Sequence, residues 1–154
     1  MPSTASIIKR LKTNYPQFRF KKSSDYLWSP SEKTVYYTSS DDCFELLLHE
    51  LSHGLLGHVD YRYDIDLLVM ERAAWEHATA LAKSYGLTIT KELVESNLDS
   101  YRDWLHARSS CPNCNATGLQ VKKQTYSCPA CNHNWKVNEA RICALRRYDS
   151  SKVK

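Results

Sequence analysis

The chain has 154 residues, a formal net charge of +4 and 25% charged residues, which allows one ordinary domain or a compact domain with a small appendage. No apolar run approaches the roughly 20 residues that a membrane span requires, and no apolar leader segment stands near the first residue. We therefore expect no membrane partner and a cytoplasmic location.

The charge is divided unevenly along the chain. Residues 1–100 carry 11 Lys and Arg against 14 Asp and Glu, a balance of −3, whereas residues 101–154 carry 10 against 3, a balance of +7. A zinc ion held by four thiolates would add −2 to the second part and leave it at about +5. The net charge of residues 101–154 is therefore opposite in sign to that of residues 1–100, which indicates two functions.

Hydrophobic periodicity and turn residues predict an α+β protein. In chain order, the expected elements are a helix at 3–15, short strands at 18–20, 25–28 and 35–38, and helices at 42–58, 67–85 and 91–108. We expect the strands to form a small, mostly antiparallel sheet on which the helices pack. Ser39 and Ser40 are candidate caps of the second helix, with Asp41 and Asp42 in its first turn.

His49-Glu50-Leu51-Ser52-His53 is the most informative stretch of the chain. Positions i and i+4 of an α-helix lie on the same face, so His49 and His53 can bind one metal ion. Glu50 lies beside them, where its carboxylate can take a proton from a water molecule at the metal, and it is the candidate catalytic residue. The alternative is a pair of solvent-exposed histidines that happen to flank a glutamate.

Glu71 is the candidate third ligand. At roughly 100° per residue it lies in the middle of an apolar stripe of the 67–85 helix, where an unpaired carboxylate is costly. Glu76 falls on the opposite, solvated side. The alternative for Glu71 is a buried carboxylate paired to an arginine or a backbone amide. His58 and His77 are interpreted as structural histidines.

Four of the six cysteines form two Cys-x-x-Cys pairs separated by 13 residues. Each pair can offer two thiolates to one tetrahedral zinc, and a hairpin between them with Trp135 on a very small core completes a zinc-ribbon pattern. The expected ligands are Cys111, Cys114, Cys128 and Cys131. Asn115 and Asn132 follow the pairs and tolerate a left-handed backbone. A zinc closed by four sulfurs has no position for water, so we assign it a structural role. Cys43 and Cys143 are expected to be small buried hydrophobic residues.

Basic residues surround the predicted ribbon. The functional interpretation is contact with the phosphates of DNA or RNA, and the alternative is a solvated basic tail. The residues expected to contact nucleic acid are Lys122, Lys123, Lys136, Arg141, Arg146 and Arg147.

The pentad, its continuation Gly54-Leu55-Leu56-Gly57-His58 and the later Glu71-x-x-Ala74-Trp75 resemble the ImmA/IrrE family of zinc metallopeptidases, over roughly residues 35–85. The resemblance implies a zincin-like minimal domain, in which a small sheet packs on the helices that carry the site, and a catalytic zinc held by two histidines and one glutamate. It also implies a prokaryotic, phage or mobile-element protease that cleaves repressor-type regulators. The appended ribbon is similar to that of SprT-like proteases, which act on DNA-bound proteins but use a histidine as third ligand.

The sequence therefore predicts a zinc metalloendopeptidase domain at residues 1–108 and a zinc ribbon with a basic tail at residues 109–154. It would hold two zinc ions, one catalytic and one structural, and act on a protein substrate, for which a DNA-binding regulator is expected. Zinc would lower the pKa of water to about 7 and polarise the peptide carbonyl, while Glu50 would pass the proton to the leaving amine. The oxyanion-stabilising group is left open among Tyr61, Tyr63, Tyr85 and His77. The competing interpretations are a SprT-like protease and a non-enzymatic, zinc-stabilised adaptor that binds nucleic acid.

Overall fold

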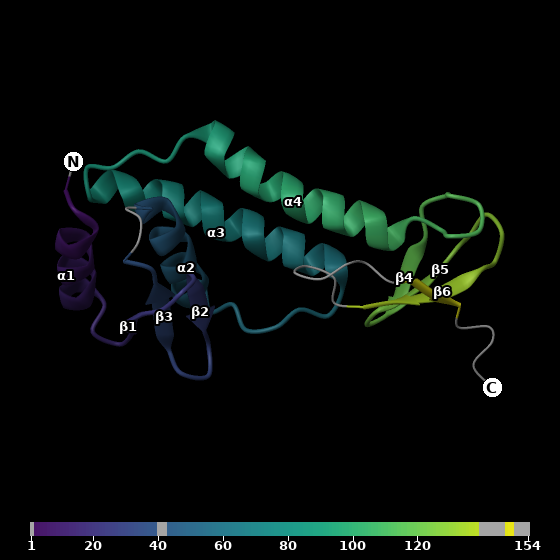
Figure 1. Ribbon diagram of the computed structural model, residues 1–154, viewed down its shortest axis with the longest axis horizontal. Helices are drawn as coiled ribbons and strands as arrows, with labels where there is room; N and C mark the ends of the chain where they lie inside the picture. Colours follow the sequence, from purple (N-terminus) through teal and green to yellow (C-terminus); the bar gives the residue numbers. More distant parts are fainter. Residues whose placement is uncertain (1, 40–42, 139–146, 150–154) are drawn as a thin grey trace. The chain divides into compact units, whose positions relative to one another are not determined.

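The computed structural model describes residues 2–39, 43–138 and 147–149, and the chain divides into two compact units (Figure 1). The first unit comprises Met1–Asp60 and Met70–Val94, and the second comprises Tyr61–Val69 and Glu95–Lys154. The fold is α+β, as predicted. In the part of the chain that the structure describes, no helix is both long enough and apolar enough to cross a membrane.

A three-stranded sheet lies in the first unit. Its strands are β1 (Arg19–Lys22), β2 (Leu27–Ser29) and β3 (Thr34–Tyr37), in the order β1-β3-β2. β2 and β3 are antiparallel, as predicted, but β1 and β3 run parallel, which the sequence interpretation did not foresee. The reason is burial: β3 is the most buried of the three strands and takes the central position, so β1 pairs with β3 rather than with its neighbour in sequence, β2.

Helix α2 (Phe44–Leu55) carries the His-Glu pentad and packs against β2 and β3. Its apolar residues recur at helical spacing and are buried on one face, namely Phe44, Leu47, Leu48 and Leu51. The helix is shorter than the predicted 42–58 range because the chain leaves helical geometry before Gly57, whose φ is +71°.

The start of α2 also differs from the prediction. Cys43 takes the N-cap position and no side chain caps the helix, so Ser39 is not its cap. The other predicted contributors, Ser40, Asp41 and Asp42, lie outside the described residues. Glu45 supplies the negative charge in the first turn, where it interacts favourably with the helix dipole.

The remaining helices lie close to their predicted ranges. α1 (Thr4–Asn14) is capped by the Ser3 side chain and contacts β1. α3 (Asp64–Ser84) begins three residues before the predicted start at residue 67 and ends before Gly86, whose φ is +71°. α4 (Lys91–Ser109) buries Leu98 and Trp104, so these residues form core rather than a ligand site. Both α3 and α4 contribute residues to both units.

The predicted ribbon is present in the second unit. Strands β4 (Leu119–Lys122), β5 (Thr125–Ser127), β6 (Asn134–Val137) and β7 (Arg147–Asp149) form an antiparallel sheet in sequence order. Trp135 is fully buried and stacks on Tyr126 at 5.6 Å between ring centroids, as the small core requires. A Cβ on Gly118 would lie 2.3 Å from the Trp135 ring, so only glycine fits there.

A buried ion pair joins the ribbon to two helices of the same unit. Arg108 of α4 donates to the Asp64 carboxylate of α3 at 2.8 Å, and Tyr126 of β5 donates to the same carboxylate. Arg108 and Asp64 are 1% and 2% exposed. Burial and the Asp64 contact raise the pKa of Tyr126. The Asp64 N–H donates in turn to the Gln120 side chain of β4, so every element of this junction is hydrogen-bonded.

Substitution of Asp64 by Asn should therefore destabilise the second unit strongly. The change leaves the Arg108 guanidinium buried without its counter-charge, and removing one member of a buried ion pair typically costs about 3–5 kcal/mol. Denaturant unfolding of the metal-loaded protein measures this loss of unfolding free energy.

The matched control is Glu76→Gln, which breaks a pair with Arg72 in which both side chains are more than half exposed. This exposed pair should contribute about 0.3–0.5 kcal/mol. Equal unfolding free energies for the two variants would show that the Asp64–Arg108 pair does not hold the junction together.

Candidate active site and metal centres

Three ligand atoms from α2 and α3 meet within the first unit. His49 Nε2 lies 3.1 Å from His53 Nε2 and 3.0 Å from Glu71 Oε2. His53 Nε2 lies 3.3 Å from Glu71 Oε1. All three side chains are buried, so the structure brings together the two histidines and the glutamate that the sequence predicts, as a group able to hold a metal ion.

The spacing of these atoms fits a tetrahedral metal. Ligands at about 2.0–2.2 Å from a zinc ion lie about 3.3–3.6 Å from one another at tetrahedral angles. The observed separations of 3.0–3.3 Å are close to those edges. Two imidazole nitrogens and a carboxylate that converge on one point also need a cation or a proton between them, because their lone pairs otherwise repel.

The charge of Glu71 favours a cation at this point. Burial on its own raises the pKa of Glu71, but hydrogen bonds and charge interactions with His49 and His53 outweigh it and lower the pKa to about 2. In the described part of the chain, the polar partners of this carboxylate are the two histidines, and no arginine or backbone amide pairs with it. The low pKa keeps the Glu71 carboxylate ionised at neutral pH, as a metal ligand requires.

The two histidines are held in different ways. The His49 ring stacks on Trp75 of α3, with 4.2 Å between centroids and 23° between planes, whereas its Nδ1 is buried with no hydrogen-bond partner among the described residues. His53 Nδ1 lies 2.8 Å from His58 Nδ1. Ligand histidines usually donate their second N–H to such a partner, which fixes the tautomer and the ring orientation. His53 thus has an orienting partner, and His49 has an aromatic support.

His58 was interpreted from the sequence as a structural histidine that points away from the ligand face. His58 is not part of the candidate ligand group, but its ring contacts the ring of His53. The chain turns after α2, and this turn returns residue 58 to the end of that helix. Burial, with the nearby His53 second, lowers the pKa of His58. The neutral imidazole can accept the His53 proton. The five-residue spacing concealed this contact, since it places His58 off the ligand face of a continuous helix.

Glu50 is anchored by a residue that the sequence interpretation missed. The backbone N–H of Trp28, in edge strand β2, donates to Glu50 Oε2 at 2.8 Å, and the Trp28 indole donates to the His58 carbonyl at 3.2 Å. The same ring covers Gly54, where a Cβ would lie 3.0 Å from it. Glu50 is less buried than the three ligands. The only signal for this role in the sequence was a tryptophan in a short strand.

The predicted oxyanion-stabilising residues have other contacts. His77 Nδ1 lies 3.0 Å from the Ser52 hydroxyl, which itself donates to the Leu48 carbonyl, so this nitrogen of His77 has a partner outside the candidate ligand group. The Tyr85 hydroxyl accepts from Asn14 of α1. Tyr61 and Tyr63 belong to the second unit.

The four cysteines of the ribbon form a second group able to hold a metal ion. Cys111 Sγ lies 3.7 Å from Cys131 Sγ, and Cys114 Sγ lies 3.6 Å from Cys128 Sγ. These distances exclude disulfides and match the edges of about 3.8 Å expected for tetrahedral zinc–sulfur bonds of about 2.3 Å. A hydrogen bond from the Asn113 side chain lowers the pKa of Cys131, while hydrogen bonds to the other three cysteines raise the pKa of Cys114.

The backbone around the cysteines follows the expected pattern. Asn115 and Asn132 both have positive φ, at 63° and 61°, and each donates its N–H to the carbonyl of the first cysteine of its pair. Asparagine tolerates this left-handed geometry better than most residues do. Cys43 is half-buried and its Sγ lies 3.5 Å from Glu45 Oε2, so it is less buried than predicted. Cys143 lies outside the described residues.

The predicted nucleic-acid contacts are only partly covered by the structure. Lys122 and Lys123 stand at the β4–β5 turn and Lys136 in β6, and all three are exposed. Arg147 begins β7, while Arg141 and Arg146 lie outside the described residues. Nucleic-acid binding by these residues stays a prediction.

The chain was compared with models of protein families, with curated protein sequences and with solved structures, and none of them matches it. The chemistry of the two metal-binding groups therefore has to be judged from their geometry.

Replacement of His58 by Ala should weaken metal binding at the histidine site while leaving the cysteine site unchanged. The substitution removes the partner of His53 Nδ1, and loss of such a partner typically costs about 10–100-fold in metal affinity. Competition with a chromophoric chelator measures both affinities in one titration.

His77→Ala is the control. His77 also contacts α2, but through the Ser52 hydroxyl and not through a candidate metal ligand. If the two variants lost metal equally, His58 would have no specific part in holding His53.

Proposed function

We propose that this protein is a zinc-dependent metalloendopeptidase. The observation that carries the proposal is the convergence of His49, His53 and Glu71 within 3.3 Å of one another, with Glu50 on the same turn of α2. Two histidines and one carboxylate make up the ligand set of catalytic zinc sites, which keep one position open for water or substrate. The four-cysteine group has no open position and therefore suits a structural zinc.

Glu50 is suited to act as the general base. Trp28 holds Oε2, while no described residue hydrogen-bonds to Oε1, so this oxygen is free to receive a proton from water. Zinc, when bound, polarises the peptide carbonyl and lowers the pKa of water to about 7. In hydrolysis the water oxygen bonds to the carbonyl carbon, Glu50 takes the water proton and gives it to the amine nitrogen, and the C–N bond breaks.

The hydrogen bond from the Trp28 backbone also limits the positions that the Glu50 carboxylate can take. A general base works within hydrogen-bond distance of the proton that it takes, and one fixed carboxylate oxygen limits the swing of the other. The backbone of β2 thus fixes the orientation of the Glu50 side chain, as His58 fixes that of His53. Both anchors join the site to the rest of the first unit.

The substrate that we propose is a protein, and a DNA-binding regulator is the preferred class. Support comes from the resemblance to ImmA/IrrE proteases in the pentad and in Glu71-x-x-Ala74-Trp75, and from the glutamate as third ligand, which distinguishes this site from the SprT-like pattern. The exposed lysines of the ribbon suit the phosphates of nucleic acid, to which such a regulator would be bound.

A non-enzymatic adaptor that binds nucleic acid is the second proposal. The observation that favours it is the closed four-cysteine group beside the exposed lysines Lys122, Lys123 and Lys136, which could function without the histidine site. In such an adaptor Glu50 would have no chemical role.

Glu50→Gln should keep both metal ions and lose peptide hydrolysis. The amide cannot accept the proton, and general-base catalysis typically contributes about 10²–10⁴-fold in rate. Digestion of a peptide library followed by mass spectrometry measures the activity, and elemental analysis counts the metal. Glu45→Gln, the same change on the same helix, should cleave at the wild-type rate because Glu45 is not part of the ligand group.

Two results would argue against the peptidase. One is a zinc-loaded wild-type protein that cleaves no peptide in the library, and the other is an unchanged rate in Glu50→Gln. Salt-dependent binding to DNA in either case would favour the adaptor.

A further inference from the structure

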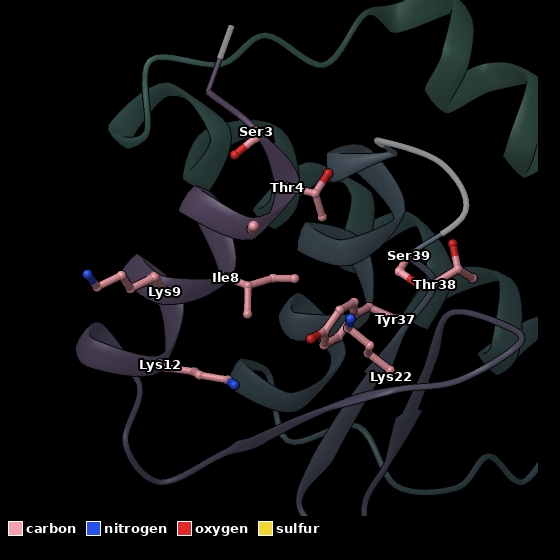
Figure 2. A pocket seen from close by; sticks show the side chains of 10 residues that line it. Ser3, Thr4, Ile8, Lys9, Lys12, Lys22, Tyr37, Thr38 and Ser39 are labelled. Atoms are coloured by element: carbon pink, nitrogen blue, oxygen red, sulfur yellow. The ribbon is translucent and has the colours of Figure 1, made fainter.

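A cavity of about 460 Å³ lies in the first unit, lined by residues of α1, β1 and β3 that the proposed chemistry does not use (Figure 2). It is separate from the histidine site, because none of the residues that line it is a ligand or Glu50. Its volume is within the range of about 300–1,000 Å³ that is typical of small-molecule sites.

Three lysines are among the described residues that line the cavity, and no described lining residue is a carboxylate. They are Lys9, Lys12 and Lys22. The side-chain amines of these three lysines form no ion pair or hydrogen bond with another described residue. The surrounding sequence is strongly basic, since residues 1–24 contain six Lys and Arg and no Asp or Glu. Among the described residues, no carboxylate neutralises these three charges, which favours an anion here.

Tyr37 adds a directed donor to this charge. Its side chain is 7% exposed, yet no described residue hydrogen-bonds to its hydroxyl. Figure 2 shows the hydroxyl pointing into the space between β3 and α1, toward which the Lys12 amine also extends from the opposite side. The residue as a whole is thus buried while its hydroxyl stays accessible to the cavity, where it can donate to a ligand or to water.

The first turn of α1 contributes to the same wall. Ser3, Thr4 and Ala5 border the cavity, and the first turn of this 11-residue helix contains no acidic side chain. The partial positive charge of a helix N-terminus acts within the first turn, so it favours an anion only at this end of the cavity, whereas Lys12 lies in the last turn of α1. Ile8 and the Tyr37 ring leave part of the cavity apolar, which suits an organic body attached to the anion.

We propose that this cavity binds a ligand that carries a phosphate group, with Lys12, Lys22 and the Tyr37 hydroxyl as its main contacts. Lysine is a common phosphate ligand as a compact point charge, and the hydroxyl donates to a phosphate oxygen. The apolar part of the cavity selects a phosphate ester over inorganic phosphate. The phosphate belongs either to a soluble ester or to the backbone of a nucleic acid.

Calorimetric titration of the metal-loaded protein with phenyl phosphate, inorganic phosphate and succinate tests the proposal. Phenyl phosphate should bind saturably and more tightly than inorganic phosphate, and succinate more weakly than either. Tyr37→Phe removes one donor to a charged group and should weaken phenyl phosphate binding about tenfold. The double variant Lys12→Met with Lys22→Met should weaken it further, whereas Lys83→Met, an exposed lysine outside the cavity, should leave it unchanged.

A single-stranded oligonucleotide identifies the source of the phosphate. Displacement of phenyl phosphate by the oligonucleotide, lost in Tyr37→Phe, assigns the site to nucleic acid, and no displacement assigns it to a soluble ester. The proposal is overturned if wild-type protein binds neither phosphate probe, as expected if the lysines only balance Asp41 and Asp42, which follow Ser39 in the sequence. It is also overturned if succinate binds as tightly as phenyl phosphate, or if Tyr37→Phe and the double lysine variant keep wild-type affinity.

Discussion

The burial of one carboxylate between two imidazoles is the constraint on which the account of this protein depends. Glu71 is 5% exposed, and its oxygens face His49 and His53 at 3.0 and 3.3 Å. Taking a carboxylate out of water is costly unless a positive charge and hydrogen bonds replace the solvent. A metal cation at the meeting point supplies that charge and uses all three lone pairs at once. The packing of α2 and the supports at Trp75, His58 and Trp28 keep the donor atoms in place.

The second unit meets a similar requirement with an ion pair in place of a candidate metal centre. Asp64 is buried as deeply as Glu71, but an arginine and a tyrosine neutralise and bond it. Asp64 and Glu71 both lie on α3, and they differ in the groups that neighbour their carboxylates. Asp64 has a fixed cation and therefore serves structure. Glu71 faces two imidazoles, whose neutral nitrogens have lone pairs for a metal ion, which makes it suitable as a ligand.

The sequence predicted the site wherever a periodic pattern carried the information. The i, i+4 spacing of the histidines, Glu71 on an apolar stripe and the paired cysteines each follow from local geometry. Trp28 and His58 were missed because their roles arise from tertiary contacts: a strand edge that meets α2, and a turn that returns the chain to His53. The parallel pairing of β1 with β3 depends likewise on which strand is most buried. The early start of α3 reflects Asp64, whose acidic side chain suits a first turn but whose partners are distant in sequence.

The location of the metal ions tests the central claim most directly. Anomalous diffraction at the zinc edge, from crystals of protein loaded with zinc, would locate every zinc ion on the chain. We expect one peak about 2.0–2.2 Å from His49 Nε2, His53 Nε2 and a Glu71 oxygen, and a second about 2.3 Å from the four cysteine sulfurs. A peak at the cysteines with none at the histidines would contradict the claim that His49, His53 and Glu71 form a metal centre.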